Sequence, residues 1–315
     1  MVMYSSRQEN YEKWLHGFAA KLNLPLKDNL LKNPAELGKG MIQAHTISAH
    51  FSYVVMNLEL EKDLEFQREA GGLEGFSLSF NQIESCEDKK LLRNDIFLSD
   101  TRNSLQTKIP AGSTVKRLII FYSDELAAKY LPAGLLTQLQ DFARENQLSA
   151  NEYFIGLPHR EILKEIFDIK EDDPLGQAKL LSHVIRLTEK FLQSFLTRDK
   201  AAAPKHLKKN DLESMQHIEQ ILSSRLEGFP SLESLAHVVF MSTSKLKNLF
   251  KQVYGHTLYD YYNKSRLQRA KEMLITGQCS IKQAGSEIGF SNLSHFAKAF
   301  KKEFGVLPRD IVKNR

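Results

Sequence analysis

Lysine, asparagine, serine and histidine side chains recur in two short segments near the C-terminus, where helical spacing places them on one face. Asparagine can form two hydrogen bonds with the edge of adenine, and lysine can donate to guanine or pair with a phosphate. These residue types therefore predict two helix faces that bind a nucleic acid. The candidates are Ser244, Lys245, Lys247, Asn248 and Lys251 in the first segment, and Asn292, Leu293, His295, Lys298, Lys301 and Lys302 in the second.

The candidate residues divide by expected role. The first exposed turns of such helices reach base edges, whereas later turns approach the phosphate backbone. The alternative interpretation is that both faces are only solvated. We expect base contacts from Ser244, Lys247, Asn248, Asn292, Leu293, His295 and Lys298. We expect phosphate contacts from Lys251, Lys301 and Lys302.

The two segments belong to a unit that the chain contains twice. Residues 231–255 align with residues 280–305 at an offset of 49 before a central turn and 50 after it, so that Phe250 matches Phe300. One added residue at the second turn explains the change of offset. A repeat of this kind predicts two copies of a helix-turn-helix.

Local signals mark the helix ends in the second copy. Ser280 can cap the first helix, with Gln283 completing a capping box, and Ser291 is expected to cap the second helix. Gly289 can adopt the left-handed conformation that ends the first helix. In the first copy Phe240 occupies the position of Gly289, where a bulky residue is strained if the turn requires a positive φ.

The inner faces of these helices are apolar. Phe296, Phe300 and Phe304 recur at helical spacing and predict a buried stripe, and the small residue Gly285 allows a second helix to approach closely. Between the copies, residues 257–274 predict one long helix that would fix the relative position of the two outer faces.

Charge is distributed unevenly along the chain. Residues 205–315 contain 18 Lys and Arg against 10 Asp and Glu, a net charge of +8, which leaves 25 of the 43 basic and 28 of the 38 acidic residues, a net −3, for the rest. A basic C-terminal third on a slightly acidic body favours a polyanion as partner.

The C-terminal third resembles the AraC/XylS family of bacterial transcription regulators over about residues 212–310. The resemblance implies a monomeric DNA-binding unit with two recognition helices in successive major grooves of double-stranded DNA, about 34 Å apart. It also implies RNA polymerase as a partner, and base reading at the equivalent positions Asn248 and Lys298. The matching residues are Arg266, Leu267, Ala270, Gly289, Phe290, Ser291, Phe300, Lys301, Phe304, Gly305 and Pro308.

The preceding part of the chain predicts a sensor domain at 1–196, a linker at 197–211 and the DNA-binding domain at 212–315. Residues 41–122 favour strands, and the alternation in "FSLSF" (76–80) is typical of a half-buried strand. "KIPAGSTV" (108–115) resembles a turn of cupin-like barrels, and "NPAELGKG" (33–40) resembles the sensor half of siderophore-responsive members. The fold class is therefore α+β, with a cupin-like β-rich sensor and an all-α double helix-turn-helix domain.

Residues 123–196 predict helices that follow the barrel. Within 177–196, Leu180, Val184, Leu187, Phe191 and Phe195 form an apolar stripe at near-heptad spacing. The resemblance implies that such a helix forms a homodimer contact. The alternative is that the stripe packs against its own barrel.

These patterns predict a ligand-responsive, sequence-specific transcription regulator, more an activator than a repressor, that is not an enzyme. The alternative is a DNA-targeted enzyme or repair protein, but its zinc site would need four thiolates and the chain has only Cys86 and Cys279. We expect no metal and no cofactor, but an apolar or aromatic effector, or a metal chelate, in the barrel. The sequence shows no signal peptide and no membrane span, which favours the cytoplasm.

Overall fold

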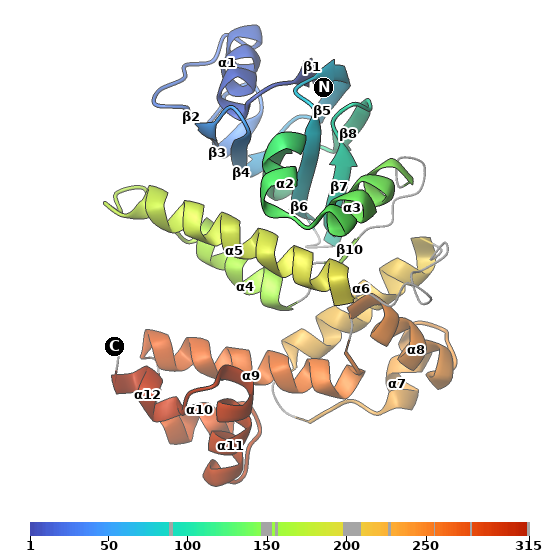
Figure 1. The fold of residues 1–315 in the computed structure, drawn as a ribbon. Helices are drawn as coiled ribbons and strands as arrows, with labels where there is room; N and C mark the ends of the chain where they lie inside the picture. The colour runs from blue at the N-terminus through green and yellow to red at the C-terminus, as the bar shows by residue number, and fades with distance from the viewer. Residues whose placement is uncertain are drawn as a thin grey trace. The chain divides into compact units, whose positions relative to one another are not determined.

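The chain divides into two units, Met1–Thr197 and Arg198–Arg315 (Figure 1). The computed structural model describes residues 1–87, 91–145, 153–154, 157–197, 209–225, 228–254, 256–277 and 279–313. Most of the predicted linker at 197–211 lies outside these residues. Strands and helices form the first unit and helices the described part of the second, so the predicted α+β class is confirmed.

Two β-sheets form the framework of the N-terminal unit. The larger sheet has the order β10-β7-β6-β9-β4-β3-β2 with antiparallel neighbours, and the smaller has the order β1-β5-β8, in which β1 and β5 are parallel. The strands are β1 (Val2–Gln8), β2 (Leu30–Lys32), β3 (Gly38–Ser48), β4 (Phe51–Leu60), β5 (Leu64–Gly72), β6 (Gly75–Ser85), β7 (Leu91–Asp100), β8 (Leu105–Ile109), β9 (Ser113–Ser123) and β10 (Tyr153–Phe154).

The larger sheet is buried on both faces. On one face Val55 and Leu118 join a core cluster with side chains of the helices that follow the strands. On the other face Met56 and Ile119 join a cluster with the first helix and the smaller sheet. The helices are α1 (Tyr11–Lys21), α2 (Asp124–Tyr130), α3 (Ala133–Glu145), α4 (Leu157–Phe167) and α5 (Gly176–Thr197). Burial on both faces explains the almost continuous apolar run of β4.

The prediction of a half-buried strand at 76–80 is wrong. Ser77 is only 5% exposed and Ser79 only 3%, because the face that carries them is covered by the smaller sheet and α1. The hydroxyl oxygens of Ser77 and Tyr11 lie 3.3 Å apart, so one hydroxyl donates to the other in the interior. The alternation in this strand therefore directs apolar side chains into one buried face of the sheet and serine side chains into the other, more polar one.

Helix α5 uses its apolar stripe within its own unit. Leu180, Val184, Leu187, Phe191 and Phe195 are all buried in one cluster with side chains of the larger sheet. The structure therefore corrects the predicted dimer contact through this stripe and supports the alternative, packing against the protein's own sheet. The opposite face of α5 remains exposed, with Ile185 at 55%.

The C-terminal unit is arranged around one long helix, α9, as predicted. Tyr261 in its first half packs on Phe250 and Tyr254, and Leu267 in its second half packs with Phe296. The α7–α8 pair lies toward one end of α9 and α10–α12 toward the other (Figure 1). The helices are α6 (Lys209–Ser224), α7 (Leu232–Val238), α8 (Thr243–Tyr254), α9 (Leu258–Thr276), α10 (Ile281–Glu287), α11 (Leu293–Phe304) and α12 (Pro308–Lys313).

Candidate nucleic-acid interface

Helices α7 and α8 form the first helix-turn-helix. The Ser231 hydroxyl accepts from the backbone N–H of Ser234 at 3.0 Å and caps α7, and the Ser242 hydroxyl accepts from the N–H of Lys245 at 3.2 Å at the start of α8. Phe240 lies in the turn with φ +52°, which confirms that this position requires the left-handed conformation. Its side chain is 92% exposed, so no burial compensates for the backbone strain. The expected end of this repeat, Gly255, lies outside the described residues.

Helices α10 and α11 form the second copy. The capping box is confirmed, because Ser280 accepts from the N–H of Gln283 while the Gln283 side chain accepts from the N–H of Ser280. Gly289 has φ +79° as predicted. Asn292, and not Ser291, caps α11, because the residue added in the second turn shifts the cap position by one.

Close packing fixes the angle between α10 and α11. A β-carbon placed on Gly285 would lie 3.1 Å from the Phe296 ring, so only glycine leaves room for that ring without a shift. Phe296 and Phe300 are fully buried, and Phe304 packs against the same cluster, which confirms the predicted stripe. Leu246 and Phe250 fill the equivalent positions of α8. Each recognition helix thus presents its opposite face outward.

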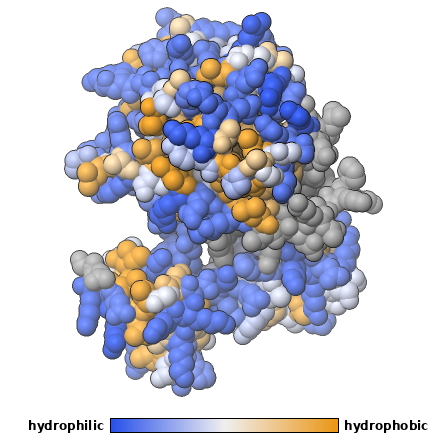
Figure 2. All heavy atoms as spheres, viewed as in Figure 1, coloured by the Kyte–Doolittle hydropathy of each residue, from blue (hydrophilic) through white to orange (hydrophobic). Residues whose placement is uncertain are grey.

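All eleven candidate residues are exposed on these outer faces. Leu293 is 49% exposed, so its side chain is available for an apolar contact with a base methyl group. Hydrophilic side chains cover much of the visible C-terminal unit, with smaller hydrophobic areas between them (Figure 2). The structure thus places each candidate where a duplex could reach it.

Two candidates have contacts within the protein that limit their use. Lys245 forms an ion pair with Asp211 of α6 at 2.7 Å, so part of its charge is already neutralised. The Asn292 side-chain oxygen accepts from the N–H groups of Ser294 and His295 at 2.8 and 3.2 Å. Asn292 therefore offers an incoming base its amide donor rather than a free donor–acceptor pair. Neither contact was signalled by the sequence pattern.

Arg266 braces the linker helix. One guanidinium nitrogen donates to the Ile288 carbonyl at 2.8 Å, and another donates to the Asn263 side chain at 2.7 Å. The guanidinium also lies over the rings of Tyr262 and Phe290, with centroids at 4.6 and 4.9 Å. Arg266 thereby ties α9 to the end of α10 and to the second turn.

Helix α6 was not assigned in the sequence analysis, yet it completes the first copy. The Tyr261 hydroxyl donates to the buried Glu219 carboxylate at 2.7 Å, and the Tyr254 hydroxyl donates to the Met215 carbonyl at 3.3 Å. Met215 and Ile218 of α6 are fully buried. Helices α6 and α9 therefore both hold the first recognition helix, α8.

The described residues hold no group of three or more His, Cys, Asp or Glu that could bind a metal ion. Both cysteines are free thiols. His45 of β3 stacks on Tyr53, with ring centroids 4.9 Å apart, and burial lowers the pKa of its imidazole.

In the same described part of the chain, no helix is long and apolar enough to cross a membrane.

Comparison with known proteins identifies the class of this domain. Residues 235–314 match the helix-turn-helix domain family. The chain is 34% identical over 90 residues to the HTH-type transcriptional regulator ArgR of Pseudomonas aeruginosa, covering 29% of this chain and 27% of that one. It is 32% identical over 83 residues to the HTH-type transcriptional activator RhaS of Escherichia coli, covering 26% and 30%. The chain thus spans less than a third of the length of these relatives.

Solved structures are also similar to part of this chain. An AraC-type DNA-binding regulator from Chromobacterium violaceum is 28% identical and covers 34% of this chain and 96% of that chain, with a TM-score of 0.32. The family match identifies residues 235–314 as a helix-turn-helix domain, and the curated relatives that share it are named HTH-type transcriptional regulators. The relatives are named as transcriptional regulators, which supports the predicted absence of enzyme activity and not the alternative of a DNA-targeted enzyme.

Proposed function

We propose that this protein is a sequence-specific DNA-binding transcriptional regulator that responds to a small ligand in its N-terminal unit. The observation that carries the proposal is the pair of matching helix-turn-helix units, each with an exposed basic and amide-bearing helix face, joined by α9. Activation is part of this proposal and is supported by the activator among the relatives. A contact with RNA polymerase and a cytoplasmic location are proposed with it.

The length of α9 bears on how the DNA is bound. A helix of 19 residues is about 28 Å long, whereas successive major grooves on one side of B-DNA lie about 34 Å apart. Because Arg266 braces α9 against the second helix-turn-helix, α9 cannot lengthen the distance between the two recognition helices. DNA bound by both helices would therefore bend toward the protein, and easily deformed sequences between the two half-sites would be preferred.

The repeat assigns roles to individual side chains. Asn248 and Lys298 lie at equivalent positions, 50 residues apart, on the outer faces of α8 and α11. We assign them to base edges, adenine for Asn248 and guanine for Lys298. Lys301 lies next to the buried Phe300, nearly one turn further along α11, and we assign it to a phosphate.

Binding-site selection with the full chain tests the function. We expect an enriched sequence with two half-sites about one helical turn apart. Asn248→Ala and Lys298→Ala should each relax preference at one base position, at a cost of about 1–3 kcal/mol. Lys301→Ala should weaken binding to all sequences and reduce the slope of log K against log salt by about one.

A matched control separates these effects from loss of charge. Lys62→Ala removes an exposed lysine of the N-terminal unit, paired with Glu36, and should leave DNA binding unchanged. No enrichment over random competitor at moderate salt would refute the regulator. An even loss across all sites for Lys298→Ala would show a phosphate contact and refute its base-reading role.

Homodimerisation through 177–196 remains a proposal, but it must use the face of α5 opposite to the buried stripe. Ile185, near the middle of α5, is a large exposed apolar side chain outside the buried stripe. Ile185→Glu should shift a concentration-dependent dimer to monomer in sedimentation velocity. An unchanged dimer would place the contact elsewhere.

A further inference from the structure

A cavity of ≈ 70 Å³ lies between the two sheets of the N-terminal unit. Its wall combines cationic, hydroxyl and aromatic side chains, whereas the sequence analysis predicted an apolar or aromatic effector, or a metal chelate, in the barrel. The residues that matter for its chemistry are Arg68, Arg117, Tyr11, Ser77, Trp14 and Phe66. They come from β5, β9, α1 and β6, so the cavity is enclosed by elements distant in the sequence.

Arg117 is a buried cation to which the described part of the chain offers no ion pair. Its side chain sits on the β9 face between Val115 and Ile119, and the residue is only 5% exposed. Its Nε has no hydrogen-bond partner among the described residues, and no ion pair reaches its guanidinium there. Burial lowers the pKa of Arg117 to about 10, so the group still carries its charge at neutral pH. An uncompensated buried charge is costly and normally has a counterion.

The neighbouring acidic group does not supply that counterion. The Asp95 carboxylate attracts Arg117, but it is buried and forms an ion pair with Arg93. Its other oxygen accepts from the Asn81 amide at 2.6 Å. Asp95 is therefore already used, and Arg93 adds a further positive charge nearby.

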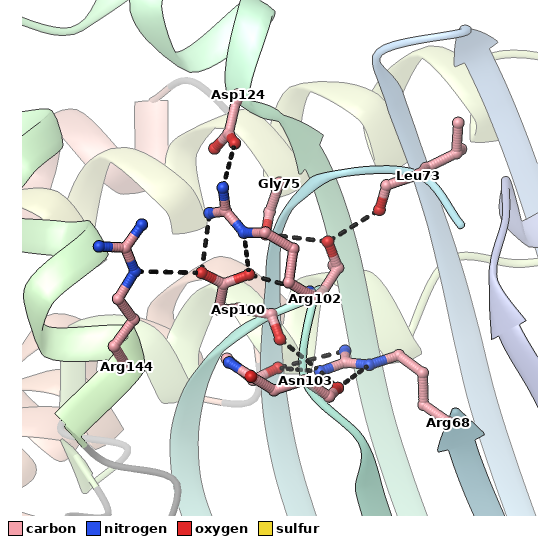
Figure 3. A network of polar contacts seen from close by, with 10 residues as sticks. Arg68, Leu73, Gly75, Asp100, Arg102, Asn103, Asp124 and Arg144 are labelled. Carbon is pink, nitrogen blue, oxygen red and sulfur yellow. Dashed lines mark hydrogen bonds and ion pairs between the residues drawn. The ribbon is translucent and has the colours of Figure 1, made fainter. Parts of the chain in front are cut away.

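A second guanidinium lines the same cavity from the smaller sheet. Arg68 donates to the carbonyls of Asp100 and Asn103 at 2.9 and 3.3 Å and to the Ser99 hydroxyl at 3.3 Å (Figure 3). These acceptors are neutral, so they orient the Arg68 guanidinium without cancelling its charge. The cavity wall also includes Arg7 and Glu9, one charge of each sign. The excess charge of the wall is therefore positive.

The remaining wall suits a small organic anion. Tyr11 and Ser77 offer hydroxyl groups, and the rings of Trp14 and Phe66, with centroids 5.4 Å apart, offer apolar surface. A water molecule needs about 10–15 Å³ of such a cavity, so ≈ 70 Å³ accommodates about five or six non-hydrogen atoms. A short-chain monocarboxylate has this size, a single negative charge and an apolar end.

We propose that this cavity binds a small monocarboxylate, with the carboxylate paired to Arg117 and the apolar end against Trp14 and Phe66. Binding follows from the cavity alone, while the role of this anion as effector rests on the proposed regulatory function. Arg117 is then the residue that distinguishes an acid from its neutral analogue.

Isothermal titration calorimetry of the full chain with sodium butanoate, without DNA and at constant ionic strength, tests the proposal. We expect one butanoate per chain and at least thirtyfold weaker binding of butanamide, which has the same number of non-hydrogen atoms but no charge. Sodium phosphate, which lacks an apolar end, should also bind at least tenfold more weakly. No butanoate binding, equal binding of butanamide, or binding of phosphate alone would each overturn the proposal.

Variants identify the residue responsible. Arg117→Met should abolish butanoate binding and raise the melting temperature of the unliganded chain, because it removes an unpaired buried charge. Arg117→Lys keeps the charge and should bind butanoate within tenfold of the parent. Arg186→Met, at an exposed arginine of α5 that pairs with Glu165, should bind as the parent does. Parent-like butanoate binding by Arg117→Met would refute the assignment.

The outcome is distinguishable from that of the proposed function. Sequence enrichment by the ligand-free chain tests DNA recognition, and butanoate binding without DNA tests the cavity. If butanoate binds through Arg117 but no DNA sequence is enriched, the cavity assignment stands and the regulator is refuted. If DNA is enriched but butanoate does not bind, the reverse holds.

Discussion

Phe240 offers a direct test of the turn geometry. The residue has φ +52° and a side chain that is 92% exposed, whereas its counterpart Gly289 has φ +79°. A left-handed conformation costs a residue with a β-carbon about 1–2 kcal/mol. Glycine removes this cost but adds about 0.5–1 kcal/mol of backbone entropy to be lost on folding. Phe240→Gly should therefore stabilise the C-terminal unit by about 0.5–1 kcal/mol.

Two matched variants isolate the backbone from the side chain. Phe240→Ala removes the ring but keeps the β-carbon, so it should leave stability nearly unchanged. Gly289→Ala introduces a β-carbon at the equivalent position of the second copy and should destabilise by about 1 kcal/mol. Since the phenyl ring of Phe240 makes only a distant contact with His237, at 6.3 Å between centroids, the comparison is not confounded by lost packing.

Urea unfolding followed by two probes separates the units. Trp14 is the single tryptophan and lies in the N-terminal unit, so its fluorescence should not change its midpoint in any of the three variants. The helical signal in circular dichroism should shift its midpoint for Phe240→Gly by about 0.5 M urea, given a slope of about 1–3 kcal/mol per molar. If Phe240→Ala stabilises as much as Phe240→Gly, ring exposure rather than φ is responsible and the reasoning fails.

Three further outcomes follow from the structure. Burial raises the pKa of the Asp100 carboxyl but the hydrogen bonds from Arg102 outweigh it, so this pKa lies below its ordinary value of 3.8. The stability that Asp100 contributes is therefore present above about pH 4 and lost as the pH falls through its folded-state pKa. Asp100→Asn should cost about 2 kcal/mol at neutral pH and weaken the fall of the melting temperature with decreasing pH. An unchanged dependence of the melting temperature on pH would contradict this. Arg266→Ala should lower the stability of the C-terminal unit by about 2 kcal/mol. It should weaken DNA binding without changing the slope of log K against log salt, whereas a slope reduced by one would show that Arg266 contacts a phosphate. A fragment of residues 205–315 should fold alone and bind DNA, and an unfolded circular dichroism spectrum would show that the domain boundary is misplaced.

Short-range signals in the sequence predicted most of the C-terminal unit. The capping box at Ser280, the left-handed Gly289 and the buried Phe296 depend on residues within one or two helical turns, and all are confirmed. The cap of α11 was missed by one residue, because the repeat alignment paired Ser291 with Ser242, the cap of α8, whereas Asn292 holds the equivalent position. The outward direction of the candidate side chains could be predicted, but not the ion pair of Lys245 with Asp211 of α6.

Long-range pairing explains what the sequence did not predict in the N-terminal unit. The strands β1 and β5 pair in parallel although about sixty residues separate Val2 from Leu64, and no local pattern specifies such a partner. Helix α1 carries readable signals, an Asn10 cap and buried Leu15 and Phe18, but it was not assigned. The two-sided burial of β6 and the packing of α5 likewise depend on which elements cover the larger sheet.

The two-sided burial of β9 has a mechanical consequence. Arg117 and Leu118 are consecutive residues, and their side chains enter different interiors, the cavity and the cluster that contains α5. The interior on the Leu118 side is close-packed and has low compressibility, so it absorbs little of any displacement of the strand. If the cavity binds an anion as proposed, movement of Arg117 toward that anion would strain the packing of Leu118 against the helical layer. That layer includes α5, which ends at Thr197, the last residue of the unit, so occupancy of the cavity would place stress on the segment that leads to the C-terminal unit.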